Sequence, residues 1–119
     1  MAQLPLDAFR VLFVEHPLPM FVYDTGTLQI LEVNQALLSH YGYTRDEMLA
    51  MRITDIRPPE DIPRLLESLR ERQDVWFRAG GWRHRHKSGA IVDVDITSYP
   101  LVFDGRRASL VIAQDITER

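Results

Sequence analysis

The chain has 119 residues, no cysteine and a formal net charge of −3 at pH 7. This length suits one domain, and the lack of cysteine excludes disulfides, thiolate metal sites, cysteine nucleophiles and thiol–flavin photochemistry. The charge gives no general attraction to nucleic acid or an acidic membrane. Since no apolar run or N-terminal pattern indicates a membrane span or a signal peptide, we expect a cytoplasmic domain without direct membrane insertion.

One amphipathic helix and one hairpin are predicted at the start of the chain. Leu6–Glu15 has its apolar residues on one side, and Pro17 ends it. Two strands, Met20–Asp24 and Leu28–Val33, flank the turn residues Thr25-Gly26, which is typical of a hairpin.

Three helices should follow, over Gln35–Tyr41, Arg45–Met51 and Glu60–Arg72. Asn34 is a good N-cap for the first of them, and Gly42 ends it. Thr44, with Glu47 three residues on, forms the pattern of a capping box for the second. The third has one apolar stripe and acidic residues in its first turn.

The last third of the chain predicts three antiparallel strands joined by tight turns. The strands are Trp82–Lys87, Ile91–Phe103 and Arg107–Ile116, the turns are Ser88-Gly89 and Asp104-Gly105, and 73–80 is a connection. Helices grouped between two sets of strands indicate an α+β fold with an antiparallel sheet. The two sets can join if the first strand lies beside the last.

The register of the first two meander strands depends on the loop at Gly89. A two-residue loop would turn arginines toward the apolar face, whereas a three-residue loop pairs Arg85 with Asp93 and Arg83 with Asp95. We expect the second, since opposite charges across strands are favourable and a buried arginine needs a partner. The inward face then holds Trp82, His84, Val92, Val94 and Ile96.

Several short motifs, in order, resemble those of a PAS domain, the Per-Arnt-Sim sensory module. They are Asp24-Thr25-Gly26, Asn34, the run 42–49, Pro59-Glu60-Asp61, Lys87-Ser88-Gly89 and the terminal run 115–119. The resemblance implies a five-stranded antiparallel sheet with helices on one face and an inner cavity. It also implies a sensory or dimerisation module of a larger protein, such as a bacterial two-component histidine kinase, a cyclic-dinucleotide enzyme or a transcription regulator. We expect an N-terminal helix over 1–16, the domain proper over 17–119, and an effector domain beyond the C-terminus.

The last strand is apolar on both faces, so its outer face also needs a cover. The N-terminal helix can cover it, from the same chain or from a partner, and PAS domains often dimerise through such a helix. We therefore expect a homodimer, with interface candidates Leu6, Phe9, Phe13, Leu110 and Ile112.

The inner cavity could hold a small molecule, or its residues could simply fill a core. The candidate lining residues are Phe21, Tyr23, Leu37, Tyr41, Met48, Ile53, Ile56, Leu65, Leu69, Trp82, His84, Val94, Ile96, Val111 and Ala113. Tyr23, Tyr41 and His84 supply the few polar groups that a mostly apolar pocket needs.

The sequence does not identify a cofactor, and the leading expectation is that none is bound. Non-covalent flavin is the open alternative, because Trp76 and Trp82 could stack on its ring. The flavin-binding branch of the family has a cysteine, two asparagines and a glutamine at positions that match Ile53, His84, Val94 and Ala113, and all four differ. Haem-binding members use a histidine on the long helix, and Glu60–Arg72 has none. His84 and His86 share a strand face but lack a third metal ligand.

A purely regulatory domain is the expectation, because no nucleophile–base–acid pattern indicates an enzyme. The terminal Asp115 and Thr117 are candidates for signal transmission into a following helix, or act only as a helix cap. The alternative function is a ligand-free dimerisation or protein-interaction module.

Overall fold

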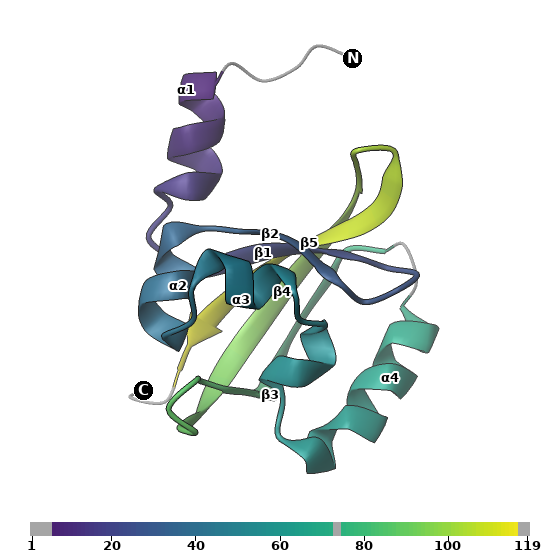
Figure 1. Ribbon diagram of the computed structural model, residues 1–119. Helices are drawn as coiled ribbons and strands as arrows, with labels where there is room; N and C mark the ends of the chain where they lie inside the picture. The colour runs from purple at the N-terminus through teal and green to yellow at the C-terminus, as the bar shows by residue number, and fades with distance from the viewer. Residues whose placement is uncertain (1–5, 73–74, 117–119) are drawn as a thin grey trace.

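The computed structural model describes residues 6–72 and 75–116. Its five strands form one antiparallel sheet in the order β2-β1-β5-β4-β3 (Figure 1). The strands are Met20–Asp24 (β1), Ile30–Val33 (β2), Phe77–Arg85 (β3), Ile91–Phe103 (β4) and Arg106–Asp115 (β5). Because β1 pairs with β5, the first hairpin joins the meander edge to edge. The predicted α+β fold is confirmed.

The helical segments lie where the sequence places them, with one addition. They are Leu6–Phe9 (α1), the π-helical turn Arg10–Val14 (η1), Gln35–Tyr41 (α2), Arg45–Leu49 (α3), the 3₁₀ turns Ile53–Ile56 (η2) and Pro59–Asp61 (η3), and Ile62–Glu71 (α4). The η2 turn was not predicted. Thr44 and Glu47 form the predicted capping box, and Gly42 ends α2 in the left-handed conformation with φ 83°.

Asn34 ties the first hairpin to α2. Its side-chain oxygen accepts hydrogen bonds from the backbone N–H of Leu37 at 3.0 Å and of Met20 at 2.9 Å. Its Nδ2 donates to the carbonyl of Leu18 at 2.9 Å. The predicted N-cap is thus also a buried clamp that holds the start of β1 against the start of α2.

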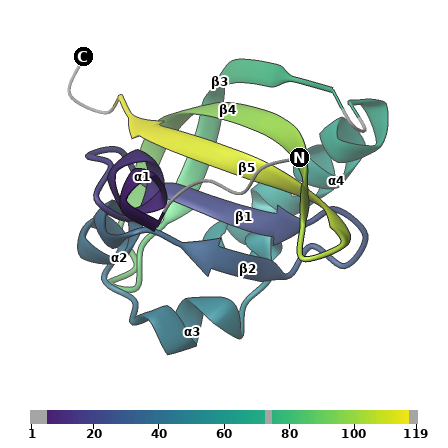
Figure 2. The same ribbon diagram turned by 90° about the horizontal axis from the view of Figure 1, so that it is seen from above.

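Each face of the sheet has its own apolar cluster. The inner cluster lies between the sheet and the helices that follow β2, and it includes Phe21, Leu37 and Ile96. The outer cluster gathers Phe13, Met20, Val22 and Ala108, with Leu110 and Ile112 packed against them. Cover from the N-terminal segment of the same chain comes from Phe13 and Val14 of η1, whereas α1 projects away from the domain (Figures 1 and 2).

The register between β3 and β4 corrects one expectation. The faces are as predicted, since Trp82 and His84 are buried beside Val94 and Ile96. The pairs are shifted by two residues, however, so that Arg83 lies opposite Asp93, and Arg85 lies opposite Ile91. The predicted pairs Arg85–Asp93 and Arg83–Asp95 are wrong.

The shift follows from where the turn closes. The backbone N–H of His86 donates to the carbonyl of Ala90 at 2.8 Å around a three-residue loop in which Gly89 has φ 94°. Arg83 finds its partners elsewhere, with its Nη2 2.8 Å from Asp61 and 3.2 Å from Glu60 at the start of α4. The acids of η3 therefore also hold Arg83, beyond its pairing opposite Asp93.

Strand β3 also begins five residues earlier than predicted, at Phe77 in place of Trp82. The segment 77–80 was expected to be a connection. A register shift between Ala79 and Trp82 accommodates the glycine pair as a bulge, with Gly81 at φ 79°. This conformation suits glycine and interrupts the alternation by which a strand is recognised.

Candidate functional site

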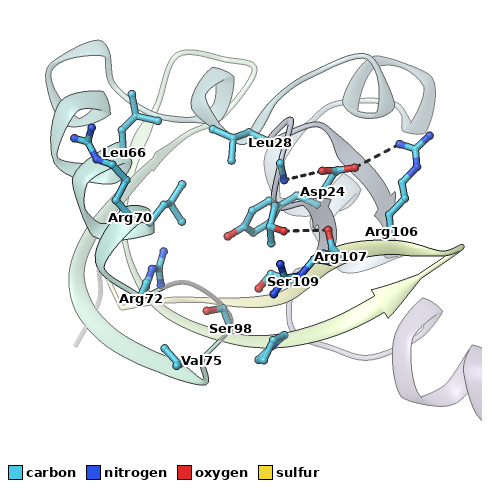
Figure 3. Close-up of a pocket in the computed structure, with 16 residues that line it drawn as sticks. Asp24, Leu28, Leu66, Arg70, Arg72, Val75, Ser98, Arg106, Arg107 and Ser109 are labelled. Carbon is cyan, nitrogen blue, oxygen red and sulfur yellow. Dashed lines mark hydrogen bonds and ion pairs between the residues drawn. The ribbon is translucent and has the colours of Figure 1, made fainter.

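A pocket of about 730 Å³ lies at one end of the concave side of the sheet. Its walls come from α4, from the turn between β1 and β2, and from the facing parts of β4 and β5 (Figure 3). Leu28, Leu66, Leu69, Pro100 and Ala108 give it apolar walls. Its volume is within the range of roughly 300–1,000 Å³ typical of small-molecule sites.

The charged groups of the pocket are mostly positive. Arg70, Arg72, Arg106 and Arg107 line it, with Asp24 as the acidic residue among the described lining side chains. Asp24 is already engaged: its Oδ1 accepts from the backbone N–H of Gly26 at 2.7 Å, and its Oδ2 lies 3.6 Å from Arg106. Backbone hydrogen bonds keep the pKa of this carboxyl below its usual value, so it stays charged.

Arg72, the residue at which α4 ends, is half-buried, whereas Arg70 and Glu71 before it are exposed. Its guanidinium stacks over the Phe77 ring, 3.7 Å from the ring centre. Among the described residues, its Nε and Nη1 are buried and have no hydrogen-bond partner. The loss of water lowers the pKa of Arg72, which is the cost of holding a cation in a partly dry site.

Tyr23 forms the inner wall of the pocket. It is buried, and Ser109 lies directly opposite it on the neighbouring strand β5. Burial raises the pKa of Tyr23, while the nearby charges of Arg72 and Arg57 oppose that rise. The hydroxyl is therefore neutral at pH 7 and keeps a proton to donate.

A second arginine is buried more completely. Arg57 is 4% exposed, and its guanidinium lies 5.1 Å from the ring centre of Trp82. In the described part of the chain its Nε and Nη1 also lack hydrogen-bond partners. Burial lowers its pKa to about 10. Arg57 lies close enough to Tyr23 and Arg72 for their charges to affect one another.

Most of the predicted cavity residues gather in the inner apolar cluster, with Leu69 at its margin and His84 buried beside it. Two of them, Tyr23 and Leu69, also line the pocket. The others pack against one another, and their contact with a ligand stays a prediction.

Tyr41 and His84 form a buried polar pair. The Tyr41 hydroxyl oxygen and His84 Nδ1 are 2.5 Å apart. Burial raises the pKa of Tyr41 and lowers that of His84, so both are neutral at pH 7. His86 stacks on the Tyr41 ring at 4.5 Å between centres.

The end of β5 lies near this pair. Asp115 pairs with Val94 of β4. Burial lowers the pKa of His86, and the negative charge of Asp115 opposes that fall. For Tyr41, burial raises the pKa and the charge of Asp115 adds to the rise. The backbone N–H of Ile116 donates to the carbonyl of Asp93 at 3.0 Å. Thr117, the other predicted transmission residue, lies outside the described residues.

Of the predicted interface residues, Phe13 is buried on its own chain, whereas Phe9 is 38% exposed. Leu110 and Ile112 are half-buried in the outer cluster. The side chain of Leu6 is outside what the structure describes. Their role in a dimer stays a prediction.

The positions that matched flavin-binding residues are all in the core. Ile53, His84, Val94 and Ala113 are each at most 2% exposed. Within residues 6–72 and 75–116, no three His, Asp or Glu side chains are grouped as metal ligands. Over the same residues, none of the helices has the length and apolar character needed to cross a membrane.

Sequence reasoning missed the arginines of the pocket and the buried Arg57. Arg70 and Arg72 fall at the polar end of the predicted helix Glu60–Arg72. One feature of the sequence could have indicated that Arg57 is buried. It stands between Ile56 and two prolines, an apolar and conformationally restricted stretch. Its burial, however, depends on contacts with β3.

Known proteins share this architecture. The PAS domain of an HTR-like protein from Haloarcula marismortui superposes with a TM-score of 0.79 at 22% identity, over 92% of this chain and 90% of that one. A domain of a sensory box sensor histidine kinase/response regulator from Geobacter sulfurreducens gives a TM-score of 0.77 at 29% identity, over 92% of each chain.

One curated relative is the methyl sulfide methyltransferase-associated sensor of Methanosarcina acetivorans, 22% identical over 116 residues. The match covers 95% of this chain and 11% of the relative's length. A family model described as PAS domain matches residues 17–118. With most of its length matched and a sheet and helices of the same arrangement, this chain belongs to the PAS domain family.

Proposed function

We propose that this domain is the sensory module of a larger cytoplasmic signalling protein, in which the geometry of a homodimer controls an effector domain, with a histidine kinase as the expected effector. A small molecule in the pocket adjusts that geometry. The named relatives support this proposal, since one is a sensor and another belongs to a sensor histidine kinase. The helix of residues 1–16 serves dimerisation, and residues 17–119 form the sensory domain.

The observation that carries the proposal is the course of β5. Its first residues, Arg106–Ser109, line the pocket. Its middle residues Leu110 and Ile112 pack on the outer face, and its last residue, Asp115, lies at the exit from the domain. A ligand that shifts the start of β5 therefore acts on one continuous strand that reaches both the expected dimer face and the expected effector. Such a ligand signals only if it binds two states of the domain unequally.

Native mass spectrometry of the purified chain tests the proposal. We expect a dimer that carries an additional mass, which denaturation releases. The matched variants are Phe9→Glu, on the projecting helix, and Val102→Glu, at the far hairpin, where the side chain is 74% exposed. Phe9→Glu should give monomers and Val102→Glu should not. A wild-type chain that is monomeric at high concentration would refute the dimer.

Transmission through Asp115 is tested in the full-length parent protein. Asp115→Ala should reduce the coupling of signal to output by more than it reduces stability, because its charge acts on His86 and Tyr41 at the exposed end of β5. A loss of output that merely follows the loss of folded protein would count against this role.

The second candidate function is a ligand-free dimerisation or protein-interaction module. The dense inner cluster favours it, because most predicted cavity residues pack against one another. A dimer that carries no bound mass in the native spectrum would support this function over ligand sensing.

A further inference from the structure

One cation of the pocket, Arg72, has buried donors without a hydrogen-bond partner among the described residues. Arg72 has a half-buried side chain with two buried nitrogens, Nε and Nη1, that lack hydrogen-bond partners among the described residues. The ring of Phe77 contacts its flat face but accepts no hydrogen bond in the guanidinium plane. Buried charges in proteins are normally paired and hydrogen-bonded, so a site of this kind calls for an acceptor.

Arg57, which does not itself line the pocket, repeats the pattern. It is buried, unpaired through the same two nitrogens in the described chain, and within electrostatic reach of both Tyr23 and Arg72. The charges of Arg57 and Arg72 act on each other unfavourably, so the surroundings of Arg72 are positive. A negative group placed there relieves both.

The remaining polar groups fit an oxyanion. Tyr23, Ser98 and Ser109 present hydroxyl groups from three strands of the pocket floor. The carboxylate of Asp24 is held by backbone N–H groups and Arg106, away from Arg72 (Figure 3). The walls at Leu66 and Leu69 are apolar, so the bound molecule also needs an apolar body.

We propose that this pocket binds a small organic anion, whose carboxylate or phosphate group pairs with Arg72 and whose apolar body lies against Leu66 and Leu69. The inference rests on the proposed sensory function and adds the chemical class of its ligand. Ser109 lines the pocket and belongs to β5. A bound anion that contacts Ser109 would therefore act directly on the strand that leads out of the domain.

Three probes of equal chain length test the proposal on the intact chain: octanoate, octyl phosphate and octanamide. Binding is measured by calorimetry, and the site is located from the amide chemical shifts of pocket residues such as Ser98 and Ser109. One or both anions should bind at least tenfold more tightly than the neutral amide, because hydrogen bonds to a charged group are the stronger kind. Preference for octanoate or for octyl phosphate then identifies the headgroup.

The variant Arg72→Gln should reduce that preference to near unity, and Arg78→Gln should leave it unchanged. Arg78 is an exposed arginine of β3 outside the pocket, so it controls for the loss of one positive charge. Circular dichroism checks that both variants fold. The comparison of charged and neutral probes on the wild-type chain does not depend on either variant.

Two results would overturn the anion class. One is equal affinity for octanamide and the anions, and the other is a preference that survives Arg72→Gln. If the native spectrum shows a bound mass that proves to be neutral, the anion class fails while ligand sensing stands. If no probe binds and no mass is retained, both proposals fail together.

Discussion

The free energy spent on burying Arg57 is large enough to measure. Burial lowers the pKa of this guanidinium to about 10, from an ordinary value of about 12.5. A difference of one between the folded and unfolded pKa values corresponds to about 1.4 kcal/mol. The unfolded chain therefore keeps the proton more readily than the folded domain does, and the charge costs the folded state about 3 kcal/mol at pH 7. The cost is fully present at every pH below the folded pKa.

Replacing Arg57 with methionine should stabilise the ligand-free domain. Methionine follows the aliphatic stem of arginine and brings no charge into the core. Against the gain of about 3 kcal/mol stands the loss of the contact with the Trp82 ring at 5.1 Å, worth about 1 kcal/mol. The net expectation is about 2 kcal/mol of added stability, within the range seen when buried charges are replaced by apolar residues.

Urea unfolding at pH 7, followed by tryptophan fluorescence, measures this effect. The midpoint for Arg57→Met should rise by roughly 1–2 M urea. Arg78→Met removes an exposed arginine instead and should stay within about 0.5 kcal/mol of the wild type. A fall in the midpoint for Arg57→Met would refute the reasoning, because it would mean that the folded domain pairs the Arg57 charge favourably.

Three further predictions concern stability. Asn34→Ala removes a buried clamp that binds three backbone groups and should cost about 3 kcal/mol in urea unfolding; a cost below 1 kcal/mol would contradict the clamp. His84 is buried with a pKa well below its usual value, so it must stay neutral in the fold. Stability should fall as the pH drops below about 6.5, by roughly 2 kcal/mol at pH 5. His84→Gln should flatten that profile, whereas His40→Gln, at an exposed site, should not. Gly81→Ala should cost about 1–2 kcal/mol through backbone strain, because Gly81 has φ 79° and a Cβ there would meet nothing closer than Arg64 Nη2 at 3.8 Å. Equal stability of the alanine variant and the wild type would show that the bulge relaxes.

The parts of the fold that could be predicted from the sequence are those with local causes. The N-cap at Asn34, the left-handed Gly42 and the capping box of Thr44 with Glu47 each depend on residues within four positions of one another. Local hydrogen bonds determine these helix ends, and both partners of each bond lie close together in the sequence.

The parts that could not be predicted depend on distant contacts. The predicted partner of Arg83 is Asp95 on β4. In the structure, Arg83 binds the acidic residues Glu60 and Asp61 of η3. The glycine pair at 80–81 read as a linker, because a bulge interrupts the alternation of a strand. The pocket arginines read as surface, since no local pattern distinguishes a solvated guanidinium at the end of a helix from one that is enclosed.

The cost of the buried guanidinium groups and the proposed anion site belong to one free-energy balance. Burying the unpaired Arg57 costs the folded state about 3 kcal/mol, and partial burial of Arg72 also disfavours its charge. The empty domain is therefore less stable than one with apolar residues at these sites. An anion that pairs with Arg72 recovers part of that cost and binds only the folded state, so octanoate or octyl phosphate should raise the unfolding midpoint in proportion to the logarithm of its concentration. Arg57→Met, which removes part of the cost in advance, should begin at a higher midpoint and gain less from the anion. A gain equal to that of the wild type would mean that Arg57 is not coupled to the pocket and that Arg72 acts alone.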